Sequence, residues 1–183
     1  MRKLIAAINQ TLDGFCDHTH ALADAELHDH YTELLKSSGT LLYGRVTYQM
    51  MESFWPTLVK NPSGEKDMDD FANAIQNIEK VVFSNTLKSV SWENSRLAIK
   101  SIEQEVRELK KGTGKDIAAG SPSMIAALTK LNLIDEYQLC IHPVIAGSGL
   151  VLFKNLSEKV TLKLIKTKTF QSTGAVIHYY NPI

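Results

Sequence analysis

Strand-like apolar runs alternate with helix-like segments along most of this chain, and this alternation restricts the fold more than any other feature of the sequence. The strand-like runs cover residues 3–8, 39–44, 79–84, 115–119 and 136–145. The helix-like segments cover residues 25–37, 46–55, 67–78, 101–111 and 122–131, and Pro56 is expected to end the second of them. After residue 135 strands follow one another, including 160–170 and 175–181. The pattern predicts an α/β protein with a three-layer α/β/α arrangement, a mainly parallel central sheet and an antiparallel C-terminal hairpin.

Length and charge narrow the possible functions. The 183 residues show no repeat or linker, so we expect a single domain, 1–183. Lysine plus arginine and aspartate plus glutamate both total 20, and without a basic excess we expect no nucleic-acid partner. No apolar run approaches the ~18–20 residues of a membrane span, and the N-terminus does not read as a signal peptide. Cys16 and Cys140 form no C-x-x-C pair, which indicates a reducing compartment, so we expect a cytoplasmic protein.

The stretch "DIAAGSPSMIAAL", residues 116–128, changes from strand to helix through a turn suited to an anion. Gly120 permits close approach of another molecule, Ser121 can cap the helix with its side-chain oxygen, and Pro122 fits the first helical position. The free N–H groups and positive dipole end of a helix N-terminus suit a phosphate. Such turns are common in α/β proteins, so this one alone assigns no ligand.

Two further strand ends carry polar residues of the same kind. They are Gly44, Arg45 and Thr47 in "YGRVTY", and Ser84, Asn85 and Thr86 in "FSNTLK". The carboxyl ends of parallel strands meet at one edge of a sheet, where α/β proteins bind ligands. A fold that prefers NAD usually places an acid near the ribose hydroxyls, and "FSNTLK" has none, which favours NADP. The usual dinucleotide and P-loop fingerprints are absent.

The motifs "LIAAINQTLDG", "LLYGRVTYQMM", "VVFSNTL" and "AAGSPSMIAALTKLNLIDEYQLCIHPVIAGSG" resemble the dihydrofolate reductase-like superfamily. The closest likeness is to the reductase domain of the bacterial riboflavin-biosynthesis deaminase-reductase. The resemblance implies NADPH as cofactor, a small-molecule substrate and a homodimer. It implies that the Ala7 backbone lies beside the nicotinamide and that Arg45 and Thr47 meet the cofactor phosphates. It also implies that Ser84, Asn85 and Thr86 hold the adenosine end, and that Gly120, Ser121, Pro122, Ser123 and Met124 hold the pyrophosphate.

The chain departs from the riboflavin reductases at several positions. Ser121 stands where they usually carry a second glycine, and Ala119 stands where they usually carry an acid. After the second strand, "GRVTYQMMESFWP" replaces their Asp-Pro and following Arg, and is closer to dihydrofolate reductase. We therefore expect hydride transfer to a C=N or C=O of a pyrimidine- or pterin-like molecule, resembling 5-amino-6-(5-phosphoribosylamino)uracil reductase.

Hydride transfer of this kind requires positioning, exclusion of water and, for some substrates, a proton. The candidate proton donors or substrate anchors are Asp29, Glu26 and Asp13. Asp13 precedes a glycine and also fits a turn, whereas Glu26 and Asp29 also fit the first turn of a helix, where acids are favoured.

Three alternatives stay open. One is dihydrofolate reductase activity proper, and another is an NADPH-binding protein without turnover, because fold does not fix function. The third is a metal-binding protein, since "DHTH" at 17–20 and "HDH" at 28–30 concentrate imidazole and carboxylate groups. His28 and His30 are two positions apart and do not share a helix face, so we expect no metal site.

Overall fold

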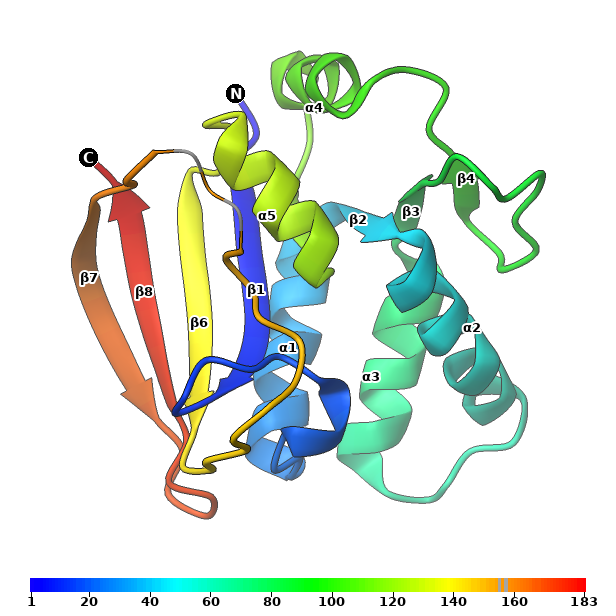
Figure 1. Cartoon of the computed structure of the whole chain (residues 1–183). Helices are drawn as coiled ribbons and strands as arrows, with labels where there is room; N and C mark the ends of the chain where they lie inside the picture. The colour runs from blue at the N-terminus through cyan, green and yellow to red at the C-terminus, as the bar shows by residue number, and fades with distance from the viewer. Residues whose placement is uncertain (155, 157) are drawn as a thin grey trace.

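The computed structural model describes residues 1–154, 156 and 158–183. Within them, eight strands form one sheet in the order β4-β3-β2-β5-β1-β6-β8-β7 (Figure 1). The strands are β1 Leu4–Thr11, β2 Ser38–Gly44, β3 Glu79–Phe83, β4 Ser95–Leu97, β5 Asp116–Ala119, β6 Glu136–His142, β7 Leu162–Thr169 and β8 Val176–Pro182. Neighbours from β4 to β6 pair in parallel, whereas β8 pairs antiparallel with both β6 and β7. The predicted parallel sheet and antiparallel C-terminal hairpin are confirmed.

Helices cover both faces of this sheet (Figure 1). They are α1 Ala25–Ser37, α2 Arg45–Lys60, α3 Lys66–Asn77, α4 Ile102–Lys111 and α5 Pro122–Lys130, with a short 3-10 turn, η1, at His18–His20. Adjacent residues of β2 show the two faces: Leu41 packs in a cluster with Phe71 of α3, and Leu42 in a cluster with Leu128 of α5. The predicted three-layer α/β/α fold is therefore confirmed.

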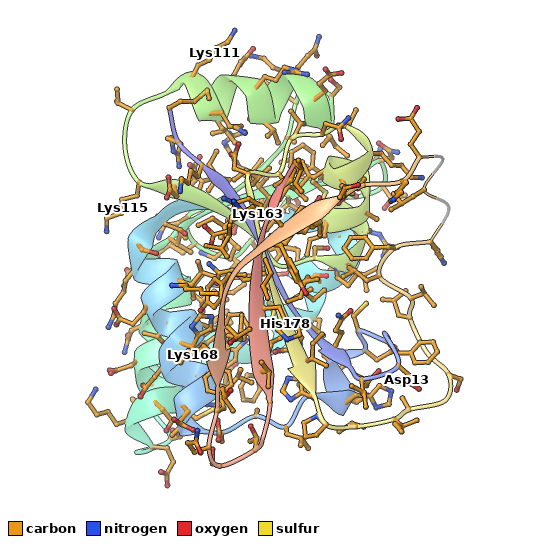
Figure 2. All side chains as sticks on the ribbon, turned by 90° about the vertical axis from the view of Figure 1, so that its left-hand side faces the viewer. Asp13, Lys111, Lys115, Lys163, Lys168 and His178 are labelled. Atoms are coloured by element: carbon orange, nitrogen blue, oxygen red, sulfur yellow. The ribbon has the colours of Figure 1, made fainter. Side chains whose placement is uncertain are left out.

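Burial follows the position of each strand in the sheet. The central strand β1 is covered on both faces, because the adjacent residues Leu4 and Ile5, which point to opposite faces, are both buried. The edge strand β7 is exposed along nearly all its length, and Figure 2 shows Lys163 and Lys168 on it beside His178 of β8. No helix in the described residues is both long and apolar enough to cross a bilayer.

Two expected element ends were wrong, and one short strand was not predicted. Pro56 lies inside α2, which continues to Lys60. A proline there removes one hydrogen bond, but α2 is held from outside, because the Trp55 ring packs on Phe71 of α3 with a centroid distance of 4.5 Å. The strand at 136–145 ends at His142 because Pro143 has no N–H to donate to a ladder. The short strand β4 was not predicted, because its three residues are too few to show hydrophobic alternation.

Candidate active site

Two helix N-termini meet at the carboxyl ends of the parallel strands. Gly44 is the N-cap residue of α2 and Ser121 is the N-cap residue of α5. The Ser121 side chain makes no capping bond to its own helix, so that expectation is wrong. Its Oγ instead accepts the Gly44 N–H at 3.3 Å and lies 3.0 Å from Thr47 Oγ1. The hydroxyl predicted to cap α5 thus joins the two helix starts.

Gly44 is required by this close approach. A Cβ at this position would lie 2.7 Å from Ser123 Oγ, so that hydroxyl would have to move, and 3.1 Å from Ser121 Oγ, which is a tight contact. The glycine therefore lets α2 and α5 point their N-termini at a shared space. Two positive dipole ends and their free N–H groups make that space favourable for an anion.

A first cavity of about 520 Å³ opens on one side of this junction. It brings together Arg45 at the start of α2 and the residues after β3, as the sequence predicted. The lining includes Gly44, Arg45, Ser84, Asn85, Thr86, Lys100, Ser101 and Met124. Sequence reasoning missed Lys100 and Ser101, which precede α4 and carry no motif. Ser101 is the N-cap of α4, with its Oγ accepting the Gln104 N–H at 3.3 Å.

A second cavity of about 670 Å³ lies on the other side of the junction, beneath α1, α2 and α3. Its walls are largely apolar, and they include Leu34, Leu35, Met50, Met51, Phe71 and Leu152. Ala7 and Gly120 both line it, and a Cβ on Gly120 would lie 3.6 Å from the Ala7 carbonyl oxygen. Val46 and Ser123 line both cavities, so the two spaces adjoin at the helix N-termini. Pro122 also lines the second cavity.

The three predicted carboxylates do not line either cavity. Glu26 accepts the Gln171 N–H at 2.9 Å and so fastens α1 to the turn between β7 and β8. Asp29 is exposed on α1. Asp13, which Figure 2 shows on the loop after β1, accepts Thr11 Oγ1–H at 2.6 Å and the Gly147 N–H at 2.7 Å. These bonds, that from Thr11 first, lower the pKa of Asp13 to about 2. The role of Asp29, Glu26 and Asp13 as proton donors stays a prediction.

Asp17 is the one carboxylate among the described residues that line the second cavity. Its Oδ2 accepts the Leu150 N–H at 2.6 Å, which ties the loop after β1 to the loop after β6. Gly149 stands beside it with φ +148°, and a Cβ there would lie only 2.3 Å from that oxygen. His18 follows Asp17 in the lining. The sequence singled out both residues only as possible metal ligands.

The histidines of the two His/Asp motifs do not converge. His28 Nδ1 lies 2.7 Å from Asp67 Oδ2 on α3, and the His30 ring packs against Tyr31 and Phe170. Across the described residues, no group of three or more His, Cys, Asp or Glu side chains could hold a metal ion.

A buried polar chain reaches the second cavity from the far side. The Leu22 N–H donates to His142 Nδ1 at 3.1 Å, and His142 Nε2 lies 3.1 Å from Asn9 Oδ1. The Tyr31 hydroxyl donates to the same Asn9 oxygen at 3.0 Å. Asn9 and Tyr31 line the cavity. Sequence reasoning missed this hydrogen-bonded chain because His142 lies more than 100 residues from its other members.

Comparison with known proteins gives matches along the whole chain. The family model described as the RibD C-terminal domain matches residues 2–176. "Uncharacterized protein YyaP" of Bacillus subtilis (strain 168) is 33% identical over 184 residues, which cover 98% of this chain and 95% of the relative.

Two solved structures extend the comparison. A diaminohydroxyphosphoribosylaminopyrimidine deaminase/5-amino-6-(5-phosphoribosylamino)uracil reductase from Thermotoga maritima superposes with a TM-score of 0.67 at 16% identity, covering 100% of this chain and 57% of that one. Dihydrofolate reductase from Enterococcus faecalis, complexed with NADP(H) and RAB-propyl, superposes with a TM-score of 0.62 at 13% identity, covering 98% and 96%. At these identities the likenesses establish the fold, which is dihydrofolate reductase-like.

Proposed function

The chain belongs to the RibD C-terminal domain family, and from this premise we propose that it is an NADPH-dependent reductase of small pyrimidine-like molecules. The observation that carries the proposal is the pair of adjoining cavities that meet at the N-termini of α2 and α5. An extended dinucleotide has the matching chemistry, with an anionic centre between two ring systems. The smaller cavity would hold the adenosine end, and the larger one the nicotinamide together with the substrate.

The smaller cavity favours NADPH over NADH. Arg45 and Lys100 bring two cations to its lining, and Ser84, Thr86 and Ser101 bring hydroxyl groups. No carboxylate is present among the described residues that line it. Lys100 is ion-paired with Glu108 outside the lining, whereas Arg45 has no carboxylate partner among the described residues and is the cation available to a phosphate on the ribose. The Gly44 and Ser121 junction fits a pyrophosphate, because a side chain at Gly44 would fill the space between the two helix N-termini.

The larger cavity supplies what hydride transfer requires of a protein. When bound, the cofactor supplies the hydride. The apolar walls from α1, α2 and α3 would exclude water, and the Ala7 and Gly120 backbones, which line the cavity, would border the nicotinamide. Asp17 is placed to hold the proton that a reduced C=N or C=O takes up, with His18 next to it. We prefer Asp17 to Asp13 because Asp17 lines the cavity and only one of its oxygens accepts a loop hydrogen bond, whereas both oxygens of Asp13 do.

The face of α1 toward the cavity favours a pyrimidine over a pterin. It contributes Tyr31, Leu34 and Leu35 to the lining and no acid, whereas Glu26 and Asp29 lie outside. A carboxylate on that helix would be needed to hold the donor groups of a pterin in the manner of dihydrofolate reductase. Dihydrofolate reductase activity proper is therefore the weaker proposal. The Thermotoga maritima relative is a 5-amino-6-(5-phosphoribosylamino)uracil reductase, and we propose a substituted uracil of this kind as the nearer substrate class.

We also propose a homodimer in the cytoplasm. The exposed edge strand β7 presents Leu164 and Ile165, each about half exposed at 50% and 51%, which a second copy could cover. Cys16 and Cys140 are both free and buried, as in a reducing compartment. Sedimentation at micromolar concentration tests the dimer, and a monomer there would contradict it.

Isothermal titration calorimetry with NADPH and, separately, with NADH tests the main proposal. We expect stoichiometric NADPH binding at least about tenfold tighter than NADH binding, because the second phosphate gains charge-assisted hydrogen bonds in the smaller cavity. Absence of binding to both nucleotides would refute the reductase. NADPH binding without oxidation by any uracil, pterin or flavin derivative would favour the binding-protein alternative.

A further inference from the structure

Asn9 is the polar side chain that reaches the larger cavity from the middle of the sheet. It lies on β1 two residues after Ala7, so both side chains point to the α1 face. Because strand residues rise about 3.3 Å each, the Asn9 side chain starts about 7 Å from that of Ala7. A group held by Asn9 would therefore lie next to the ring that Ala7 is proposed to border.

A backbone N–H fixes which atoms donate and which accept in the buried hydrogen-bond chain behind Asn9. A backbone N–H can only donate, so His142 Nδ1, which receives the Leu22 N–H, carries no proton. A neutral imidazole then carries its proton on Nε2. His142 is only 1% exposed, and burial lowers its pKa, which keeps the ring neutral. The Nε2 atom has two polar neighbours, Asn9 at 3.1 Å and the weaker acceptor Cys140 Sγ at 3.6 Å. Its proton therefore goes to Asn9, and the Asn9 atom that accepts it is the amide oxygen.

Tyr31 enforces the same orientation. Its hydroxyl donates to Asn9 Oδ1 at 3.0 Å, and burial raises its pKa well above the usual value, so the hydroxyl keeps its proton. The Asn9 oxygen thus accepts two hydrogen bonds and its amide cannot turn over without losing both. The Asn9 side-chain nitrogen donates no hydrogen bond to any described residue. It is also not one of the fully buried polar atoms that lack a partner, so it is partly accessible. Because Asn9 lines the cavity, this nitrogen is the atom of its side chain that is left to donate into that space.

We infer that the Asn9 amide nitrogen is a fixed hydrogen-bond donor that recognises a ring carbonyl oxygen of the substrate. His142 and Tyr31 are positioning residues that hold it. The inference rests on the proposed function, and it deepens it by naming the substrate chemistry: a carbonyl-bearing ring is accepted and its amino-substituted counterpart is rejected. An amino group in place of the carbonyl would face the Asn9 N–H, so that both the ligand donor and the protein donor would lack an acceptor. Unpaired buried polar groups of this kind give a site strong discrimination between ligands.

Uracil and 2,4-diaminopyrimidine are matched probes, because they share a ring and exchange carbonyl acceptors for amino donors. We would titrate each into the NADPH-mixed protein and follow the Asn9 side-chain amide signals by NMR. Uracil is expected to shift those signals and to bind at least about tenfold more tightly than the diamine. Equal affinity of the two probes, or uracil binding that leaves the Asn9 signals in place, would overturn the inference.

Asn9→Asp is the decisive variant. One carboxylate oxygen can keep the hydrogen bonds from His142 and Tyr31, and the other puts an acceptor where the amide donor was. The variant should therefore bind 2,4-diaminopyrimidine more tightly than uracil. Asn181→Asp is the matched control. It makes the same change at an exposed residue near the end of β8, outside both cavities, and should leave the affinity order of the two probes unchanged. An Asn9→Asp protein that folds and still prefers uracil would overturn the inference.

The tautomer of His142 provides a test that needs no variant and no cofactor. Long-range 1H–15N spectra of the labelled protein distinguish the two neutral forms, and we expect the proton on Nε2. A proton on Nδ1 would overturn the orientation of Asn9. If the protein binds no NADPH, the proposed function fails, whereas the tautomer and the probe preference still decide this inference separately.

Discussion

His30 should make the stability of this protein depend on pH in the mildly acidic range. The ring lies on α1 among Tyr31, Phe170 and Tyr179, with ring centroids 5.2, 6.0 and 6.4 Å away. Its Nε2 is buried without a hydrogen-bond partner in the described chain. Burial, with a smaller contribution from the positive charge of Lys168, lowers the pKa of His30 from 6.5 to about 4.

The size of the effect follows from that shift. Because the folded state resists protonation, the unfolded state binds more protons between pH 6.5 and pH 4, and stability is lost as pH falls through this range. Linkage with a folded pKa of about 4 and an unfolded value of 6.5 gives a loss of about 2 kcal/mol between pH 7.5 and pH 5. His142 contributes a loss of the same sign, since burial lowers its pKa too. The wild-type protein should therefore lose at least about 2 kcal/mol over this interval.

The His30→Phe variant isolates the contribution of one residue. Phenylalanine fits the aromatic surroundings and does not titrate, so any packing cost is the same at both pH values. Urea unfolding at pH 7.5 and pH 5 gives four free energies of unfolding. The variant should lose about 2 kcal/mol less than the wild-type protein between the two pH values. An equal loss in both proteins would refute the account of His30 as a buried neutral group.

Three further substitutions test the site and the fold. Gly44→Ala places a carbon 2.7 Å from Ser123 Oγ, so NADPH binding measured by calorimetry should weaken at least about tenfold; unchanged affinity would contradict the pyrophosphate site. Arg45→Gln should weaken NADPH binding more than NADH binding and so reduce the affinity ratio between the two nucleotides. An equal loss of affinity for both would show that Arg45 does not contact the ribose phosphate of NADPH. Lys80 is fully buried and its Nζ donates to three carbonyl oxygens at 2.9 to 3.2 Å, so Lys80→Met should lower the free energy of unfolding by about 2–4 kcal/mol in urea titrations. A loss below about 1 kcal/mol would show that those bonds contribute little.

The fold was predictable because it depends on periodicity. The helical spacing over 25–37 gave α1 its observed bounds, and alternation of strands and helices left few arrangements besides a parallel sheet. The glycine, arginine and hydroxyl residues after β2, β3 and β5 could be assigned to one place because the carboxyl ends of parallel strands share an edge. Gly44, Arg45, Ser84 and Ser121 accordingly lie around the junction of α2 and α5.

The rest of the site depends on contacts that no local pattern encodes. Asp13 and Glu26 satisfy loop N–H groups from residues more than 130 positions away, so their sequence neighbours gave no sign of that use. Asn9 meets His142 of the neighbouring strand β6, and the orientation of the Asn9 amide is set through His142 by the backbone N–H of Leu22. Lys100 reaches the smaller cavity only because the segment after β4 passes beside it.

An amide 1H–15N titration of the protein with NADPH tests the central claim most directly, because it reports both binding and place. The account predicts saturable shifts at Gly44 and Ser121, with further shifts at Ser84 and Ala7 in the two cavities. Lys163 on the edge strand β7 should not move. Shifts confined to residues outside the two cavities, or none at Gly44 and Ser121, would contradict the account.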